Sequence, residues 1–168
     1  MSFYHLHKEG VKQVKAKRAN SEQEMLKEFI KIAKKHGYKP ISGQGNDNRI
    51  ELEENYFQFG DLRVDTQSSH VVIEVETAGG VTNLVKYWYC LTKNTTISKS
   101  KKTIVLLHIF NTSSEGDYGS HQLLWDFLWS QMKKDLGDRM QAKRFKVSGT
   151  ETNELHDALT YFEKALEK

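Results

Sequence analysis

Two apolar runs on either side of one amphipathic segment constrain the fold of this chain more than any other feature. The runs cover Val71 to Thr77 and Thr103 to Phe110, and a helical pattern from about Val81 to Thr92 lies between them. Strand, helix and strand at this spacing form a right-handed crossover unit, so we expect the two strands to be parallel. The second run is continuously apolar, which is typical of a strand buried on both faces. We therefore expect an α/β protein whose mixed sheet carries helices on both faces.

The rest of the chain extends this unit in both directions. Apolar residues at helical spacing predict further helices, and alternating residues predict further strands. The predicted helices cover residues 21–36, 121–136 and 151–167, and the predicted strands cover residues 49–59, 61–66 and 144–148. A break near Glu54-Asn55 is an alternative for the strand at 49–59. The tracts 40–48 and 94–102 are predicted to be loops. The element order is thus αβββαβαβα, and we expect its first three strands to form a meander.

Length and composition favour one domain in a reducing compartment. The 168 residues can bury a sizeable core, with residues 1–20 as a basic N-terminal arm, 21–110 as the core and 111–168 as a C-terminal extension. The single cysteine, Cys90, excludes an intrachain disulfide framework and a cysteine-built zinc site. The first residues lack the apolar core of a signal peptide, and no apolar run approaches membrane-spanning length. We expect a cytoplasmic protein without a membrane partner.

Two predicted helices have apolar faces that should pack on the sheet. On the crossover helix this face comprises Val81, Leu84, Val85, Trp88 and Leu91. On the helix at 121–136 it comprises Leu124, Phe127, Leu128 and Met132.

The charge of the chain is unevenly distributed. The net charge is only +3, but segments 1–20, 93–102 and 132–147 each carry +4, which leaves −9 for the remainder. Such segregation suits a surface that binds a polyanion, although solvated loops and helix ends give the same pattern. The candidate nucleic-acid-binding residues are Lys12, Lys15, Lys17, Arg18, Lys99, Lys101, Lys102 and Arg144.

Acidic residues interrupt the predicted hairpin that precedes the crossover helix. Glu74 and Glu76 share one face of the apolar strand, where an unpaired charge is costly to bury. A turn with two free residues pairs Asp61 with Glu76, whereas a four-residue loop pairs Asp61 with Glu74. Either register brings Asp61 to the two glutamates and leaves Asp65 toward the tip of the hairpin.

The convergence of these acids has two interpretations. Mg²⁺ and Mn²⁺ prefer carboxylates and water in an octahedral shell, so the hairpin is a candidate metal site. Alternatively, Glu74 forms an ordinary cross-strand ion pair with Arg63, which faces the same side of the hairpin. Spacing alone leaves both interpretations open.

The acidic hairpin resembles the active-site signature of a known nuclease superfamily. Gly60-Asp61 is followed after twelve residues by Glu74-Val75-Glu76 and then by a helix. This arrangement is similar to that of the PD-(D/E)xK nucleases, and the predicted element order resembles their restriction-endonuclease-like core over about residues 21–110. The resemblance implies that Asp61 is the metal-binding aspartate and that Glu74 is the second metal carboxylate.

The signature departs from the family pattern at two positions. Gly60 replaces a proline, and Glu76 replaces the lysine that positions the attacking water or offsets charge on the transition state. Some restriction enzymes resemble this chain in carrying glutamate there, and other members place the basic residue on the following helix. Lys86 is the candidate on that helix, and its alternative interpretation is a solvated surface lysine. Loss of catalysis with retention of the fold is a third alternative.

The family often supplies a further acid from its first helix. Glu24 and Glu28 are the candidates, and Glu28 is preferred because Glu24 is expected to cap the helix with Ser21. A solvent-facing position is the alternative for Glu28. Glu28 and Asp65 are therefore accessory candidates.

The resemblance implies a Mg²⁺- or Mn²⁺-dependent endonuclease that hydrolyses phosphodiester bonds in DNA. Asp61, Glu74, Glu76 and Lys86 are the expected catalytic residues, and the three acids are the expected metal ligands. The alternative is a catalytically inactive module of the same fold that binds nucleic acid or a protein partner. A homodimer is among the expected partners, because cutting both strands of a duplex needs two sites.

Overall fold

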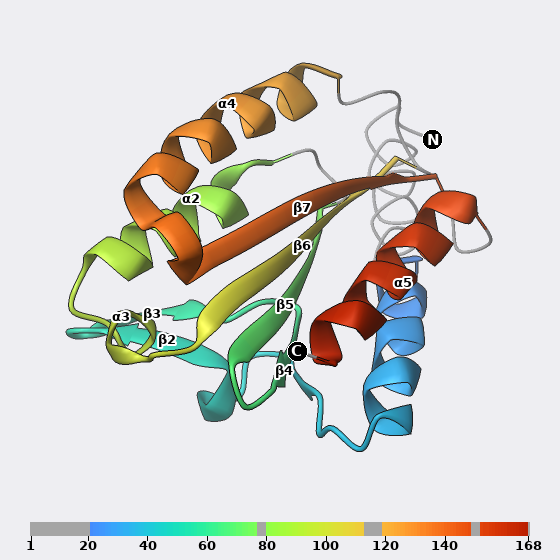
Figure 1. The fold of residues 1–168 in the computed structure, drawn as a ribbon, viewed down its shortest axis with the longest axis horizontal. Helices are drawn as coiled ribbons and strands as arrows, with labels where there is room; N and C mark the ends of the chain where they lie inside the picture. Colours follow the sequence, from blue (N-terminus) through green and yellow to red (C-terminus); the bar gives the residue numbers. More distant parts are fainter. Residues whose placement is uncertain (1–20, 77–79, 113–118, 149–151, 168) are drawn as a thin grey trace, which may run out of the picture.

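A mixed five-stranded sheet forms the centre of the computed structural model, which describes residues 21–76, 80–112, 119–148 and 152–167. The strand order is β1-β4-β5-β6-β7 (Figure 1). The strands are β1 (Ile41–Ser42), β4 (Leu62–Asp65), β5 (Ser69–Glu76), β6 (Thr103–Asn111) and β7 (Met140–Val147). The predicted mixed sheet is confirmed.

The crossover unit at the centre of the sheet has the predicted direction. β5 and β6 run parallel, with Glu74 beside His108, and α2 (Thr82–Thr92) belongs to the connection between them. β6 and β7 are also parallel, whereas β4 is antiparallel to β5 and to β1. Because β5 and β6 are covered on both faces, both consist almost entirely of buried residues.

Helices cover the two faces of the sheet as separate layers (Figure 1). The helix at residues 21–35 and α5 (Asn153–Leu166) pack on one face, against Val71, Ile73 and Val75. α2 and α4 (Gly119–Leu136) pack on the other face, against Val72 and its neighbours. Odd-numbered residues of β5 therefore point to one layer and even-numbered residues to the other, which directs Glu74 toward α2.

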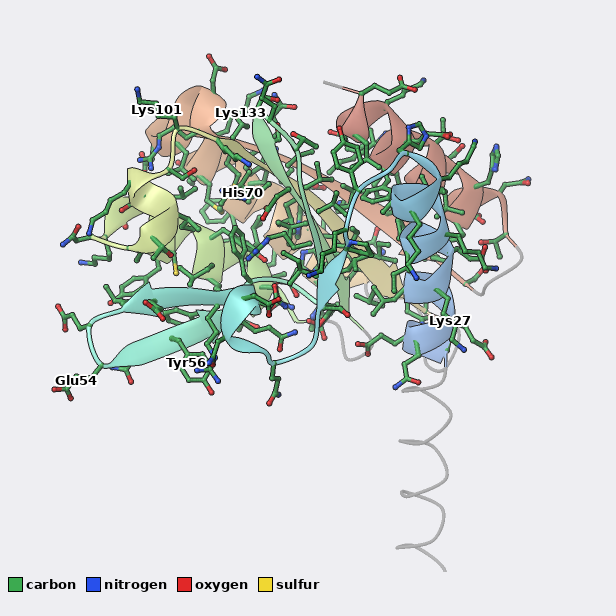
Figure 2. All side chains as sticks on the ribbon, turned by 90° about the horizontal axis from the view of Figure 1, so that it is seen from below. Lys27, Glu54, Tyr56, His70, Lys101 and Lys133 are labelled. Atoms are coloured by element: carbon green, nitrogen blue, oxygen red, sulfur yellow. The ribbon has the colours of Figure 1, made fainter. Side chains whose placement is uncertain are left out.

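The predicted meander of three strands is wrong in its first member. Residues 49–59 form a separate two-stranded hairpin, β2 (Arg49–Leu52) and β3 (Asn55–Gln58), with Glu54 at its tip (Figure 2). Glu53 in the connecting turn has a positive φ of 53°, which a continuous strand does not accommodate. The edge of the main sheet is instead the two-residue strand β1, inside the tract predicted to be a loop.

Short helices occupy three connecting segments. α3 (Thr96–Lys99) lies within the predicted basic loop and begins with a capping box formed by Thr95 and Ser98. Two 3₁₀ turns, at Asn46–Asn48 and Gly137–Arg139, precede β2 and β7.

The inward face of α2 differs from the predicted one. Its buried residues are Leu84, Tyr87, Cys90 and Leu91, whereas Val85 is 39% exposed. The helix is therefore rotated so that Tyr87 enters the core. This rotation places the neighbouring Lys86 at the margin of the buried face.

The inward face of α4 was also predicted incorrectly in part. Met132 is buried as expected, but Leu124 and Phe127 are 47% and 60% exposed. Trp125 is buried instead, and its indole Nε1 donates a hydrogen bond to His108 Nδ1 at 3.0 Å. The spacing of apolar residues does not indicate this polar contact, which places the Trp125 side of α4 against the sheet.

Candidate active site

The turn between β4 and β5 sets the position of the acidic residues. The backbone N–H of Thr66 donates to the carbonyl of Ser69 at 2.9 Å, and Leu62 pairs with Ile73. This is the register of the four-residue loop considered above. Continued by one residue, it places Asp61 opposite Glu74.

Gly60 occupies a position that only glycine accommodates without strain. Its φ is +88°, and an added Cβ would lie 2.4 Å from Cγ1 of Val72. Proline is restricted to φ near −65°, so it cannot adopt this conformation. A proline, which the signature that this sequence resembles has at this position, is therefore incompatible with the local backbone.

Glu74 is a buried carboxylate with two strong donors from α2. The residue is 2% exposed, and its Oε1 accepts hydrogen bonds from Lys86 Nζ at 2.5 Å and from Tyr87 Oη at 2.6 Å. Both donors bind the same oxygen, and among the described residues Oε2 has no donor. The ammonium of Lys86 offsets the charge that burial would otherwise disfavour, while Oε2 remains available to a ligand.

Lys86 belongs to this buried arrangement and is not a solvated lysine. Its side chain is 12% exposed, and its Nζ also lies 4.9 Å from the centre of the Tyr87 ring. Among the described residues, Glu74 and Arg63 do not form the ion pair that was the alternative interpretation of the hairpin. Arg63 instead contacts Asp65, with 3.1 Å between Nε and Oδ1.

Asp61 is held at the site by the backbone of β5. Its Oδ2 accepts a hydrogen bond from the N–H of Val75 at 2.8 Å. Burial and the negative charge of Glu74 nevertheless raise the pKa of Asp61 to about 7, against the opposing effects of that hydrogen bond and of Lys86. A carboxyl group in this state is one whose ionisation a bound cation would favour.

Glu22 is a fourth acid that the sequence interpretation missed. It lies on the helix at residues 21–35, and burial, followed by the charges of Glu76 and Glu74, raises its pKa. Glu22 also contributes to the raised pKa of Asp61. Its signal in the sequence is its spacing from Met25 and Phe29, which places an acid in line with the buried stripe.

Glu28, the preferred candidate on the same helix, lies elsewhere. Its Oε1 accepts a hydrogen bond from Lys31 Nζ at 2.6 Å, and the side chains of Lys31 and Glu28 are 70% and 40% exposed. Ser21, the predicted N-cap, already belongs to the helix, and its Oγ accepts a hydrogen bond from Asn111 at 3.1 Å.

Glu76 lies at the end of β5, beside the first turn of α2. Its Oε2 accepts a long hydrogen bond of 3.5 Å from Asn83 Nδ2. An added Cβ on Gly80 would lie 3.2 Å from the same oxygen, so the absence of a side chain at Gly80 leaves room for the carboxylate.

The four acids form a charged group without a preassembled metal cage. In the parts of the chain that the structure describes, no three His, Cys, Asp or Glu side chains are placed to hold a metal ion together. Asp61 and Glu74 are the two carboxylates brought opposite each other by the hairpin. Mg²⁺ usually retains several waters and is bound through one or two carboxylates, so this pair fits such an ion in its donor chemistry.

The predicted accessory and basic residues are distributed over several regions. Asp65 stays at the hairpin tip, where its Oδ1 lies 2.6 Å from His70 Nδ1. Lys99 ends α3, Lys101 is exposed beyond it (Figure 2), and Lys102 donates to the carbonyl of Thr66. The remaining candidates Lys12, Lys15, Lys17 and Arg18 lie outside the described residues, as does the whole predicted arm.

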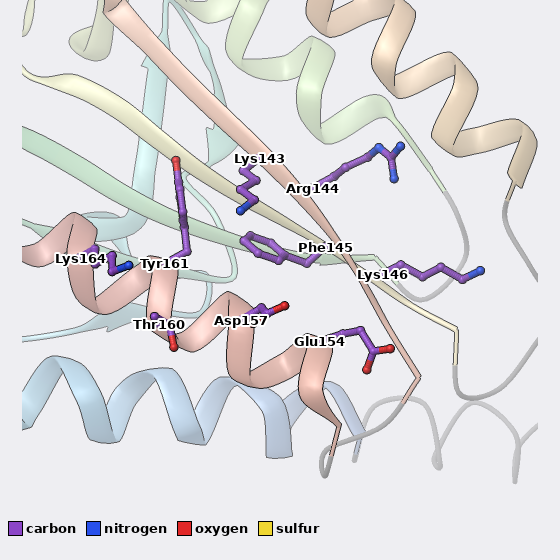
Figure 3. Close-up of a pocket in the computed structure, with 9 residues that line it drawn as sticks. All are labelled: Lys143, Arg144, Phe145, Lys146, Glu154, Asp157, Thr160, Tyr161 and Lys164. Carbon is purple, nitrogen blue, oxygen red and sulfur yellow. The ribbon is translucent and has the colours of Figure 1, made fainter.

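Arg144 is held by α4. It donates two hydrogen bonds of 2.9 Å to Asp126 and one of 2.8 Å to Gln122. In Figure 3 its side chain points away from Tyr161 and Lys143, which line a cavity of about 530 Å³ between β7 and α5. Its guanidinium thus joins β7 to α4.

Comparisons with known proteins add no assignment. No family model, curated protein or solved structure matches this chain. Over the described residues, the helices lack the combination of length and apolarity that crossing a bilayer requires.

Proposed function

We propose that this protein is a metal-dependent endonuclease that hydrolyses DNA phosphodiester bonds, with a restriction-endonuclease-like core. The observation that carries the proposal is the contact of Lys86 with the buried Glu74, opposite Asp61. The helix that follows β5 thereby places a lysine beside the two carboxylates. The mixed sheet and the resemblance of Gly60-Asp61 and Glu74-Val75-Glu76 to the family signature support the same function.

The residues of the site would divide the work of hydrolysis. The water oxygen would form a bond to phosphorus as one of its protons passes to solvent, the bond from phosphorus to the leaving sugar oxygen would break, and that oxygen would take a proton from another water. Lys86 would offset the phosphate charge and orient the water, with Glu76 as a second group that positions it. Tyr87 holds Glu74 in place through its hydrogen bond.

Asp61 and Glu74 would hold Mg²⁺ or Mn²⁺, with Glu22 and Glu76 at the outer edge of the site. When bound, such an ion supplies Lewis acidity and offsets charge at the reacting phosphate. The raised pKa values of Asp61 and Glu22 support this assignment, because burial first and then repulsion among the acids disfavour their ionised forms. The ion would relieve that repulsion.

A non-catalytic nucleic-acid-binding module is the second candidate. It is favoured by the absence, among the residues described, of three acids placed around one ion. The replacement of the signature lysine by Glu76 favours it as well. In that case Lys86 and Glu74 would form a structural ion pair.

Moving the lysine from position 86 to position 76 tests the proposal. Lys86→Gln keeps a hydrogen-bond donor near Glu74 but removes the charge, and it should lower the rate of DNA cleavage in Mg²⁺ by about 100-fold or more. Adding Glu76→Lys returns a lysine to the position used by the family, so the double variant should recover part of the lost rate. The measurement is the cleavage of a labelled duplex with excess enzyme.

Lys164→Gln is the control, because Lys164 is an exposed lysine of α5 that lies outside the three basic segments. It should cleave at the wild-type rate. Thermal unfolding of each variant separates loss of function from loss of the fold. Cleavage by folded Lys86→Gln at the wild-type rate contradicts the role given to Lys86.

A further inference from the structure

A cavity of about 450 Å³ lies away from the acids, between the β2–β3 hairpin, the β4–β5 hairpin and α3. Arg49 comes from β2 and Arg63 from β4, while Ser100 follows α3. The lining residues used below are Arg49, Glu51, Phe59, Arg63, His70 and Ser100. The cavity thus joins three elements that are distant in the sequence.

Both arginines have a buried donor that lacks a hydrogen bond. Among the residues that the structure describes, Nε of Arg49 and Nε of Arg63 are each buried without a hydrogen-bond partner. Arg63 Nε lies 3.1 Å from Asp65 Oδ1, an ion-pair contact whose geometry does not make a hydrogen bond. A buried donor without an acceptor is costly, so Arg49 Nε indicates a ligand that brings acceptor oxygens, and Arg63 Nε, whose contact with Asp65 is poorly directed, lies beside the same cavity.

The arginines are held in place by aromatic rings. The guanidinium of Arg49 lies 4.0 Å from the centre of the Tyr56 ring, and that of Arg63 lies 4.6 Å from the centre of Phe59. Nη2 of Arg63 also donates to the carbonyl of Asp47 at 2.8 Å. Such fixed orientations reduce the entropy lost when a planar guanidinium binds an anion.

The surroundings of the cavity are basic in spite of two acids. Glu51 lines it, and Asp65 contacts both Arg63 and His70. Segment 93–102, which contributes Ser100 to the lining, carries four lysines and no acid. The two acids thus offset the two arginines, and the neighbouring segment supplies the excess of positive charge near the cavity.

We infer that this cavity binds a phosphate group. The two guanidinium groups, whose orientations are fixed, would donate hydrogen bonds to the phosphate oxygens. Arginine forms paired hydrogen bonds with phosphate, and the orphaned Nε atoms belong to the donor edge used in such pairs. The phosphate comes either from a nucleic-acid backbone or from a free phosphate compound. The first source rests on the proposed function.

The location suits a backbone contact outside the reacting centre. Arg63 follows Asp61 by two residues on β4, and His70 precedes Glu74 by four on β5, so the side chains share one face of the hairpin. Two residues of strand, at Arg63, and four, at His70, span roughly 7 Å and roughly 13 Å, which is the axial rise of about two to four nucleotides. A bound strand that reaches both places would have one phosphate in the cavity and another at the acids.

Binding measured without metal tests this inference on the full chain. Arg49→Gln removes the donors of one guanidinium, Arg49→Lys keeps only the charge, and Lys164→Gln is a control at an exposed lysine of the other cavity. One arm titrates a duplex oligonucleotide in EDTA, and the other titrates inorganic phosphate while the amide resonances of Thr96 and Ser100 are followed. Wild type and Lys164→Gln should bind alike.

Arg49→Gln should lower the binding affinity for the affected ligand by about tenfold, which is the value of one charge-assisted hydrogen bond. Arg49→Lys should restore only part of the lost affinity. Weakened oligonucleotide binding identifies a backbone phosphate, and weakened binding of inorganic phosphate alone identifies a free phosphate compound. Unchanged binding in both arms overturns the inference. Because neither arm depends on cleavage, an inactive Lys86 site does not alter the result.

Discussion

Asp61 carries the most informative electrostatic environment of any single residue at the site. The pKa of its carboxyl group is raised to about 7 because burial and Glu74 disfavour the ionised form more than the Val75 N–H and Lys86 favour it. The folded protein therefore retains a proton that the unfolded chain releases near pH 4. Its contribution to stability is largest at acidic pH and falls as the pH rises through about 7.

Replacing this carboxyl group by an amide should remove that pH dependence. Asp61→Asn should be more stable than wild type at about pH 8, by about 1–3 kcal/mol, because the repulsion of Glu74 is gone. Mg²⁺ should stabilise the wild type at this pH and leave Asp61→Asn unaffected. Chemical denaturation at about pH 5 and about pH 8, with and without Mg²⁺, measures both effects. Equal pH dependence in the two proteins would contradict the assigned environment.

At the scale of elements, two helices complete a site that the hairpin begins. α2 contributes Lys86 and Tyr87 because its buried face passes through Tyr87 and Cys90. The helix at residues 21–35 contributes Glu22 at its described end, although most of it packs on the opposite face of the sheet. The acids are thus gathered around the end of β5 from both layers.

The two glutamates of the helix at 21–35 form a matched pair for experiment. Glu22→Gln should lower the cleavage rate by about tenfold, the usual effect of removing an outer-shell partner of a metal site. Glu28→Gln changes an exposed acid that is paired only with Lys31, so it should leave the rate unchanged. Initial rates of duplex cleavage in Mg²⁺ distinguish them. A larger loss in Glu28→Gln than in Glu22→Gln would refute this arrangement.

For the whole molecule, the parts that could be predicted are those that depend on neighbouring sequence. The direction of β5 and β6 follows from the crossover rule, and the partnership of Asp61 with Glu74 is one of two registers that local turn geometry permits. The break near Glu54-Asn55 is an alternative in the sequence, but the separation of the β2–β3 hairpin from the main sheet and the two-residue β1 could not be predicted in this way. Their positions depend on what packs beside them, which alternation within a strand does not encode.

In the candidate site, too, some residues could be predicted from neighbouring sequence and others depend on tertiary packing. Asp61, Glu74 and Glu76 could be selected from the hairpin alone, because strand alternation places them on one face. The contact of Lys86 required the rotation of α2, which is set by burial of Tyr87 in tertiary packing. The role of Glu22 could be recognised only once the end of its helix was seen to lie near the end of β5. Neither arrangement follows from helical periodicity, which identifies a buried stripe without its partner.

The nicking rate of supercoiled plasmid DNA by wild type and Glu74→Gln tests the central claim most directly. The substitution retains the shape of the side chain and an oxygen that can accept from Tyr87, but it removes the charge that pairs with Lys86. We predict nicking by wild type that requires Mg²⁺ or Mn²⁺ and stops in EDTA, and a rate at least about 100-fold lower for folded Glu74→Gln. Equal nicking by the two proteins, or none by wild type with either ion, would contradict the account.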